Sequence, residues 1–167
     1  GELPEIARRI SRLALIKDLS LSTNASQLAK HAESLYANGI RRINVSLDSL
    51  DRQRFAEITQ GELARVLAGL MAAKRVGMNP IKINMLVMKG INDHEISDMV
   101  SFCLEHEFTL RLIETMPVGE TGKNATQRFI SLQQVKSELA QVYDLEPAVM
   151  GGAGPASYVL VKDTPLR

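Results

Sequence analysis

Strand-like and helix-like segments alternate along this chain, and that alternation limits its fold more than any other feature of the sequence. Short runs in which apolar and polar residues alternate predict strands, and runs with apolar residues three and four positions apart predict helices. The predicted strands cover residues 19–24, 42–48, 81–88, 110–113 and 158–162, with helical patterns between the first four. Strands joined through helices pair in parallel, so the pattern predicts an α/β fold built from βαβ units.

Residues at the ends of the predicted helices indicate where each begins and stops. Gly39 is expected to end the second helix in a left-handed conformation. Asn92 or Asp93 is expected to cap the helix that follows the third strand. Ser131 and Gln134 have the spacing of a capping box, in which each side chain bonds the backbone of the other residue.

The predicted strands have one polar face, which is unusual for a parallel sheet. Parallel strands covered by helices on both sides normally read as continuous apolar runs. Side chains two residues apart share a face of a strand, and the residues that share one face here are Ser20, Ser22, Asn24, Asn44, Ser46, Asp48, Lys82 and Asn84. A half-exposed sheet with water on its polar side is one explanation. We favour a closed or partly closed (β/α) barrel whose polar interior holds a charged small molecule.

Two cations lie within predicted strands, where an unpaired charge is costly to bury. Lys82 comes early in one strand, and Arg111 lies inside another. Both would suit a phosphate-bearing ligand. Alternatively, each would pair with a nearby carboxylate such as Asp48 or Glu114. The residues alone leave both alternatives open.

Length and composition narrow the class of protein. A chain of 167 residues predicts a single domain over 1–167, with an irregular glycine-rich tail and a short strand in residues 147–167. A formal net charge of +1 argues against a protein that coats nucleic acid. No apolar run approaches the ~18 residues that cross a bilayer, and no signal-peptide pattern opens the chain. We therefore expect no nucleic-acid or membrane partner, and a cytoplasmic location.

The single cysteine excludes a disulfide or an all-cysteine metal site built within this chain. Cys103 lies on the apolar stripe of its predicted helix, so we expect an inert buried thiol. The three histidines have no ligand-like spacing. Residues 119–123 lack the glycine spacing and the Ser/Thr of a phosphate-binding P-loop. The sequence therefore predicts no catalytic residue and no metal ligand in this chain.

Five stretches of the sequence are each a weak signal of family membership, but their occurrence together and in this order is highly specific. They are Leu21-Ser22-Thr23-Asn24, residues 42–51 (RINVSLDSLD), Lys82-Ile83-Asn84, Lys89-Gly90-Ile91-Asn92-Asp93 and residues 111–119 (RLIETMPVG). With them, essentially the whole chain resembles the molybdenum cofactor biosynthesis protein A family, the radical S-adenosylmethionine (SAM) GTP 3′,8-cyclases. The chain corresponds only to the middle of such a protein.

The resemblance implies a partial (β/α) barrel and two [4Fe–4S] clusters, one N-terminal on a CxxxCxxC motif and one C-terminal. It implies that the first cluster reduces SAM to a 5′-deoxyadenosyl radical, which abstracts a hydrogen from the GTP ribose. Cyclisation to (8S)-3′,8-cyclo-7,8-dihydroguanosine 5′-triphosphate follows, which is a step in the biosynthesis of molybdenum cofactor. A homodimer of the whole protein is also expected.

The resemblance also assigns roles to residues of this chain. Ser46 is implied as a hydroxyl contact to SAM, and Met116 as the backbone position that holds its adenine. The implied GTP contacts are Ser22 or Thr23, together with Lys82 and Arg111 on the triphosphate. The strand alternation favours Ser22 over Thr23 because Ser22 shares the polar face. From their facing alone, Asn44 and Asn84 are expected to support these contacts.

Several family features are absent from this chain. The CxxxCxxC motif, the Gly-Gly-Glu-Pro motif that binds the SAM amine and the C-terminal cysteines are all missing. Ala25 stands where the family usually has glycine, and we expect only a slight change in backbone freedom. The expectation is a central fragment of the radical SAM domain that lacks the family's first strands and C-terminal cluster region and is inactive alone. The alternatives are a radical SAM enzyme with another substrate and a non-catalytic barrel scaffold that binds a nucleotide or a protein.

Overall fold

The computed structural model describes residues 2–16, 18–115, 127–148 and 157–164. The chain forms two compact units, residues 1–85 and residues 86–167. These units do not decide between one domain and two, so the single domain over 1–167 stays a prediction.

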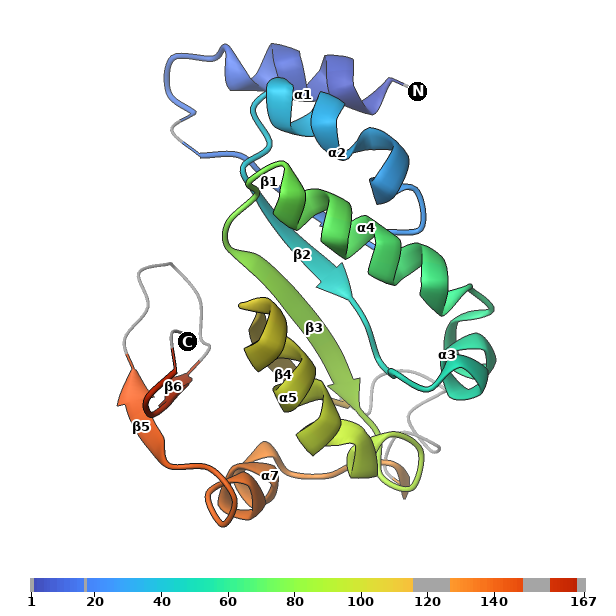
Figure 1. Ribbon diagram of the computed structural model, residues 1–167, viewed down its shortest axis with the longest axis vertical. Helices are drawn as coiled ribbons and strands as arrows, with labels where there is room; N and C mark the ends of the chain where they lie inside the picture. The colour runs from blue at the N-terminus through green and yellow to red at the C-terminus, as the bar shows by residue number, and fades with distance from the viewer. Residues whose placement is uncertain (1, 17, 116–126, 149–156, 165–167) are drawn as a thin grey trace. The chain divides into compact units, whose positions relative to one another are not determined.

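The first unit alternates helices with parallel strands (Figure 1). Its elements are α1 (Leu3–Ser11), β1 (Ser20–Thr23), α2 (Leu28–Ala37), β2 (Arg42–Ser46), α3 (Arg52–Thr59), α4 (Leu63–Arg75) and the start of β3 (Ile81–Val87). Parallel pairing joins β1 to β2 and β2 to β3. The strand order of the four-stranded sheet is β1-β2-β3-β4. The predicted α/β fold with parallel strands is confirmed.

The second unit begins within β3 and combines a short 3-10 helix with further α-helices and strands. Its elements are η1 (Asp93–Glu95), α5 (Ile96–His106), β4 (Thr109–Glu114), α7 (Leu132–Leu139), β5 (Leu145–Ala148) and β6 (Tyr158–Val161). The strands β5 and β6 form an antiparallel pair. The strand at 158–162 was predicted, whereas β5 was not, because Glu146 and Pro147 interrupt the apolar alternation that marks a strand.

The period-two alternation in the strands produces the predicted division of faces in the first unit. Residues of one face are buried almost completely, among them Ile43, Val45, Ile81, Ile83 and Met85. Fully burying a side chain of this size contributes about 1.5–3 kcal/mol. Since α2 and α4 lie side by side in Figure 1 and bury small and aliphatic residues, they supply the cover that these strands need.

The helix α4 approaches the turn before α2 closely where Gly69 meets Ala25. A Cβ built on Gly69 would lie 2.7 Å from the backbone oxygen of Ala25 and 3.0 Å from the Cβ of Leu28. Ala25 is fully buried and has a φ of 58°, in the left-handed region. An L-residue with a Cβ pays about 1–2 kcal/mol there. Alanine at this position therefore strains the backbone, which is a larger effect than the slight change in backbone freedom that its small size predicts.

Side-chain caps differ from the predicted ones at two helices. Ser131 does cap α7, since its Oγ accepts from the Gln133 backbone N–H at 3.2 Å, but Gln134 bonds Glu138 instead of completing a capping box. Neither residue 92 nor residue 93 caps α5, whose N-cap residue makes no side-chain cap bond. Gly39 ends α2 with a φ of 102°, as predicted.

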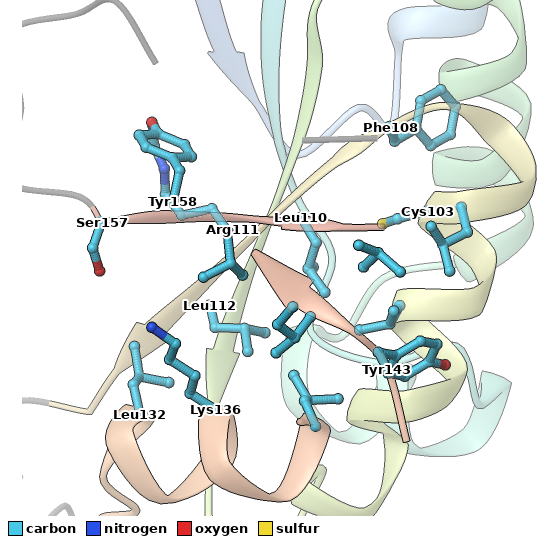
Figure 2. A pocket seen from close by; sticks show the side chains of 16 residues that line it. Cys103, Phe108, Leu110, Arg111, Leu112, Leu132, Lys136, Tyr143, Ser157 and Tyr158 are labelled. Carbon is cyan, nitrogen blue, oxygen red and sulfur yellow. The ribbon is translucent and has the colours of Figure 1, made fainter. Parts of the chain in front are cut away.

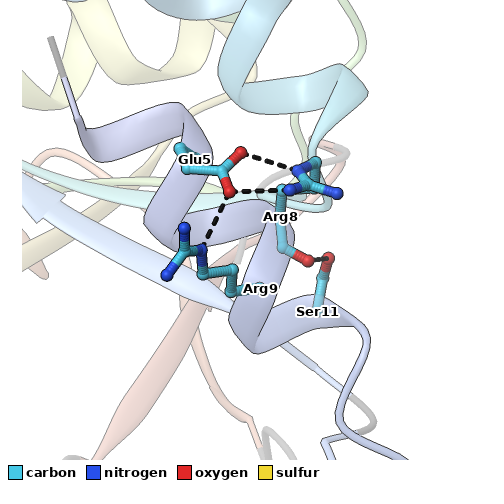
Figure 3. A network of polar contacts seen from close by, with 4 residues as sticks. All are labelled: Glu5, Arg8, Arg9 and Ser11. Carbon is cyan, nitrogen blue, oxygen red and sulfur yellow. Dashed lines mark hydrogen bonds and ion pairs between the residues drawn. The ribbon is translucent and has the colours of Figure 1, made fainter.

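On the exposed side of α1, the Glu5 carboxylate lies between two guanidinium groups (Figure 3). Glu5 accepts hydrogen bonds from Arg8 at 2.6 and 2.7 Å and from Arg9 at 2.8 Å. These bonds favour the ionised form, so they lower the pKa of Glu5 to about 2. Because the folded pKa is lowered, the stabilisation is complete above the ordinary value of 4.5 and is lost as the pH falls toward about 2.

We expect a carbon-detected NMR titration of the Glu5 carboxyl to give a midpoint near 2. In Arg8→Gln the midpoint should move toward the ordinary value, because the first of the two charged donors is lost. Replacing Arg12 with glutamine is a matched control, since Arg12 exerts only a weak coulombic effect on Glu5. A midpoint near 4 in the unmodified chain would contradict the geometry of this network.

Candidate functional site

A row of polar side chains crosses the exposed face of β1, β2 and β3. In register, Ser22 pairs with Asn44, and Asn44 pairs with Lys82. The Asn44 Nδ2 donates to the Ser22 Oγ at 3.3 Å. Because Ser22 accepts this bond, its own O–H is directed to another acceptor. The row thus offers the Ser22 hydroxyl as a donor on β1 and the half-buried Lys82 ammonium on β3, on either side of Asn44 in β2.

A second row lies one step further along β2 and β3. Ser46 pairs in register with Asn84. The Oδ1 of Asn84 is buried, and among the described residues it has no hydrogen-bond partner. A buried amide oxygen without a partner loses its hydration at a cost of about 1–3 kcal/mol. The arrangement therefore fits a ligand that places a hydrogen-bond donor, such as a hydroxyl, next to Ser46 and Asn84.

Thr23 points to the other side of the sheet. It pairs in register with Val45, which is fully buried on the helix-covered face. Its Oγ1 accepts from the backbone N–H of Ala25 at 3.0 Å and so holds the turn after β1. Of the two hydroxyls predicted near a ligand, only Ser22 lies on the polar face.

The remaining predicted residues belong to the second unit. Arg111 in β4 donates from Nη2 to the Tyr158 hydroxyl at 3.2 Å. This partner was not predicted, because 47 positions separate the two residues and no local pattern links them. Met116 lies outside the described residues, so its predicted role is not addressed.

Glu114 makes a helix cap and thereby links the end of β4 to α7. Its Oε1 accepts from the backbone N–H of Leu132 at 2.8 Å, while the Ser131 side chain bonds the next N–H. A carboxylate at a helix N-terminus is stabilised both by the bond and by the helix dipole. The Glu114 carboxylate is thus bonded to a backbone N–H, and this bond does not depend on whether other residues of β4 contact a ligand.

Replacing Glu114 with alanine should lower the free energy of unfolding by about 1–2 kcal/mol. Glu114→Gln keeps an acceptor oxygen and should lose less than half as much, because only the charge disappears. Urea denaturation of both variants measures the difference. Equal losses in the two variants would show that the hydrogen bond to Leu132 contributes nothing.

The turn after β3, at residues 88–92, is built around the side chain of Asn92. Its Nδ2 donates to the Leu86 carbonyl at 2.9 Å, and its Oδ1 accepts from the Met88 N–H at 2.8 Å. Asn92 is fully buried. Asp93 accepts from the Gly90 N–H at 2.8 Å and supports the same turn. The stretch 89–93 is therefore explained by turn geometry, and no ligand is needed to account for it.

The part of the chain that the structure describes offers no ligand set for an iron–sulfur cluster. Its single cysteine, Cys103, is 2% exposed, and burial raises the pKa of its thiol to about 12. Among the described residues, no group of three His, Cys, Asp or Glu side chains could hold a metal ion. The residues present do not fit a cluster. No described helix is both long and apolar enough to cross a membrane.

Comparisons with known proteins agree with this geometry. A family model described as the Radical SAM superfamily matches residues 1–103. Coproporphyrinogen III oxidase (HemN) from Escherichia coli, a radical SAM enzyme of known structure, aligns with a TM-score of 0.59 at 12% identity. That alignment covers 87% of this chain and 37% of the HemN chain. The likeness concerns the fold, and it confirms the predicted partial (β/α) barrel.

The chain belongs to the Radical SAM superfamily. Among curated proteins, the GTP 3′,8-cyclase of Rhizobium etli (strain CIAT 652) is 41% identical over 150 residues, which cover 89% of this chain and 43% of that protein. The GTP 3′,8-cyclase of Pseudomonas fluorescens (strain Pf0-1) is 39% identical over 162 residues, covering 96% and 49%. The predicted resemblance is confirmed. The chain spans about half the length of these relatives or less.

Proposed function

We infer that this chain is the nucleotide-holding part of a radical SAM enzyme that converts GTP to 3′,8-cyclo-7,8-dihydroguanosine 5′-triphosphate in molybdenum cofactor biosynthesis. The observation that carries this proposal is the polar face of β1–β3, with its row Ser22, Asn44 and Lys82. The identity of about 40% to GTP 3′,8-cyclases supports the choice of substrate. A cytoplasmic location and a homodimer of the whole protein stay predictions.

Each proposed contact follows from the chemistry of the side chain. The Lys82 ammonium offsets the charge of the GTP triphosphate, and the Ser22 O–H donates to GTP because Asn44 already occupies its acceptor side. Ser46 and the unpartnered Oδ1 of Asn84 suit the hydroxyl groups of the SAM ribose. The SAM role of Met116 and the triphosphate role of Arg111 rest on the family resemblance.

When bound, SAM supplies the radical that attacks the GTP ribose. The residues of this chain hold and orient GTP and SAM on the polar face of the sheet, opposite the face that the helices cover. Since the chain lacks cluster ligands, we assign no electron-transfer step to its residues. The chain by itself is therefore inactive in our proposal, whereas the longer protein is the enzyme.

Calorimetric titration of the chain with GTP tests the proposed contact of Lys82. Lys82→Gln should weaken GTP binding by about 10–100-fold, because a hydrogen bond to a charged group contributes about 1.5–3 kcal/mol. Lys89→Gln removes the same charge from an exposed position and should leave the affinity unchanged. Equal affinities for the unmodified chain and Lys82→Gln would overturn the assignment.

Anaerobic reconstitution with iron and sulfide tests the proposed inactivity. We expect no stable [4Fe–4S] absorption spectrum and no GTP-dependent cleavage of SAM by the chain alone. A stable cluster with SAM cleavage would show that the chain assembles a site which its single cysteine does not explain.

A further inference from the structure

Arg111 and Tyr158 lie next to each other in a cavity of the second unit (Figure 2). The cavity has a volume of about 350 Å³ and lies among α5, β4, α7 and the β5–β6 pair. Arg111 lies within β4, and Tyr158 is the first residue of β6. The Arg111 Nη2 donates to the Tyr158 hydroxyl at 3.2 Å. The last strand of the described chain therefore supplies a partner for a cation of the main sheet.

No carboxylate neutralises Arg111 within the described part of this cavity. Among the described residues that line the cavity there is no Asp or Glu. Glu114, the acid of the same strand, bonds the backbone N–H of Leu132 at 2.8 Å. The Nε of Arg111 is buried and has no hydrogen-bond partner among the described residues. The positive charge and this N–H therefore suit an anionic ligand.

Tyr158 is itself held in place by the pairing of the last two strands. The strands β5 and β6 are antiparallel, with Tyr158 opposite Ala148. The ladder continues past the strand end, where the Lys162 N–H donates to the Asp144 carbonyl at 2.8 Å. A tyrosine side chain has only two rotatable angles. Because the backbone of Tyr158 is fixed by this ladder, its hydroxyl has few alternative positions.

A neutral partner of this kind prepares a guanidinium for a phosphate. An arginine side chain has many rotamers and loses them when it binds an anion. A hydrogen bond that already holds the guanidinium reduces this loss. Since a guanidinium has five N–H donors, the bond to Tyr158 leaves others, including the Nε–H, for phosphate oxygens. A hydroxyl also leaves the positive charge in place, whereas a carboxylate would compete with the phosphate.

We propose that Tyr158 is a positioning residue, whose hydroxyl holds the Arg111 guanidinium in the orientation that bonds the triphosphate of GTP. This inference rests on the proposed function, which places Arg111 on the triphosphate. It deepens that function, because it adds β6 to the elements that prepare the GTP site. Tyr158 acts through Arg111 and makes no contact with GTP of its own.

Calorimetric titration with GTP tests this role in the 167-residue chain. Tyr158→Phe removes only the hydroxyl and should weaken GTP binding by about 3–10-fold. In an Arg111→Gln background the same substitution should change nothing, because its effect passes through Arg111. Tyr143→Phe is the matched control, since Tyr143 lines the same cavity but its hydroxyl lies 3.2 Å from that of Ser101. Unchanged affinity in Tyr158→Phe, or equal losses in both backgrounds, would overturn the proposal.

NMR signals of the Arg111 side chain, recorded without GTP, separate this proposal from the triphosphate assignment on which it rests. The two Nη groups of an anchored guanidinium give separate signals, whereas those of a freely turning one average. We expect separate signals in the unmodified chain and in Tyr143→Phe, and one averaged signal in Tyr158→Phe. An averaged signal in the unmodified chain would overturn the positioning role alone. If the signals are as expected but Arg111→Gln binds GTP as tightly as the unmodified chain, the triphosphate assignment fails, and the proposal fails with it.

Discussion

Replacing Asn92 with leucine should lower the free energy of unfolding by about 2–5 kcal/mol. The substitution removes both hydrogen bonds of a fully buried side chain and leaves the Leu86 carbonyl and the Met88 N–H without it. A buried backbone N–H left without a partner, here that of Met88, costs about 1–3 kcal/mol, and the lost bond to the Leu86 carbonyl adds to this cost. Leucine has as many side-chain heavy atoms as asparagine and leaves no cavity, and urea denaturation measures the loss.

A matched substitution separates this effect from a general cost of losing asparagine. Asn38 also donates to a backbone carbonyl, that of Ser34 at 2.7 Å, but Asn38 is only half-buried and its bond is exposed. In Asn38→Leu, water replaces the lost partner, and the cost should stay below about 1 kcal/mol. Equal losses at positions 92 and 38 would contradict the role of the buried turn.

Gly69→Val should destabilise the first unit by about 1–3 kcal/mol. The new Cβ would lie 2.7 Å from the Ala25 backbone oxygen and 3.0 Å from the Leu28 Cβ, so α4 must move away from the start of α2. Overpacking of this kind typically costs about 1–3 kcal/mol, and the better helix propensity of valine compared with glycine offsets only a few tenths of this cost. Thermal or urea denaturation measures the change.

Ala68→Val in the same helix provides the control for this substitution. Ala68 is exposed, so valine there should cost no more than about 0.7 kcal/mol through propensity alone. Because Ala25→Gly also relieves the left-handed strain at position 25, the double variant is compared with Ala25→Gly alone. Gly69→Val should cost nearly as much in the Ala25→Gly background, because the closest atom is a backbone oxygen and not the Ala25 methyl. A Gly69→Val substitution that costs nothing in that background would contradict this explanation.

The division of the sheet into an apolar and a polar face could be predicted because it depends only on the alternation of side chains along a strand, which repeats every two residues. Asn44 and Val45 face opposite sides in any extended strand, whatever the rest of the chain does. The same rule separated Ser22 from Thr23 before the fold was known. Parallel pairing followed from the helices between the strands.

Contacts between distant residues could not be predicted in this way. The pairing of Arg111 with Tyr158 joins β4 to β6, and nothing near either residue indicates the other. Asn92 was expected to cap a helix because asparagine is common there, but a buried turn with two backbone partners satisfied its amide more fully. Pairing of Lys82 or Arg111 with a carboxylate such as Glu114 was one of two open alternatives, and Glu114 bonds the N-terminus of a helix that begins 18 residues later.

Side-chain amide NMR signals of two asparagines test the central claim, that the polar face of β1–β3 is the nucleotide site. Asn44 bonds Ser22 beside Lys82, and Asn84 pairs with Ser46. On titration of the chain with GTP and then SAM, we expect the Nδ2 signals of Asn44 and Asn84 to shift while the signal of Asn38 in the turn after α2 stays in place. If GTP and SAM leave Asn44 and Asn84 unchanged at saturating concentration, the polar face is not the site.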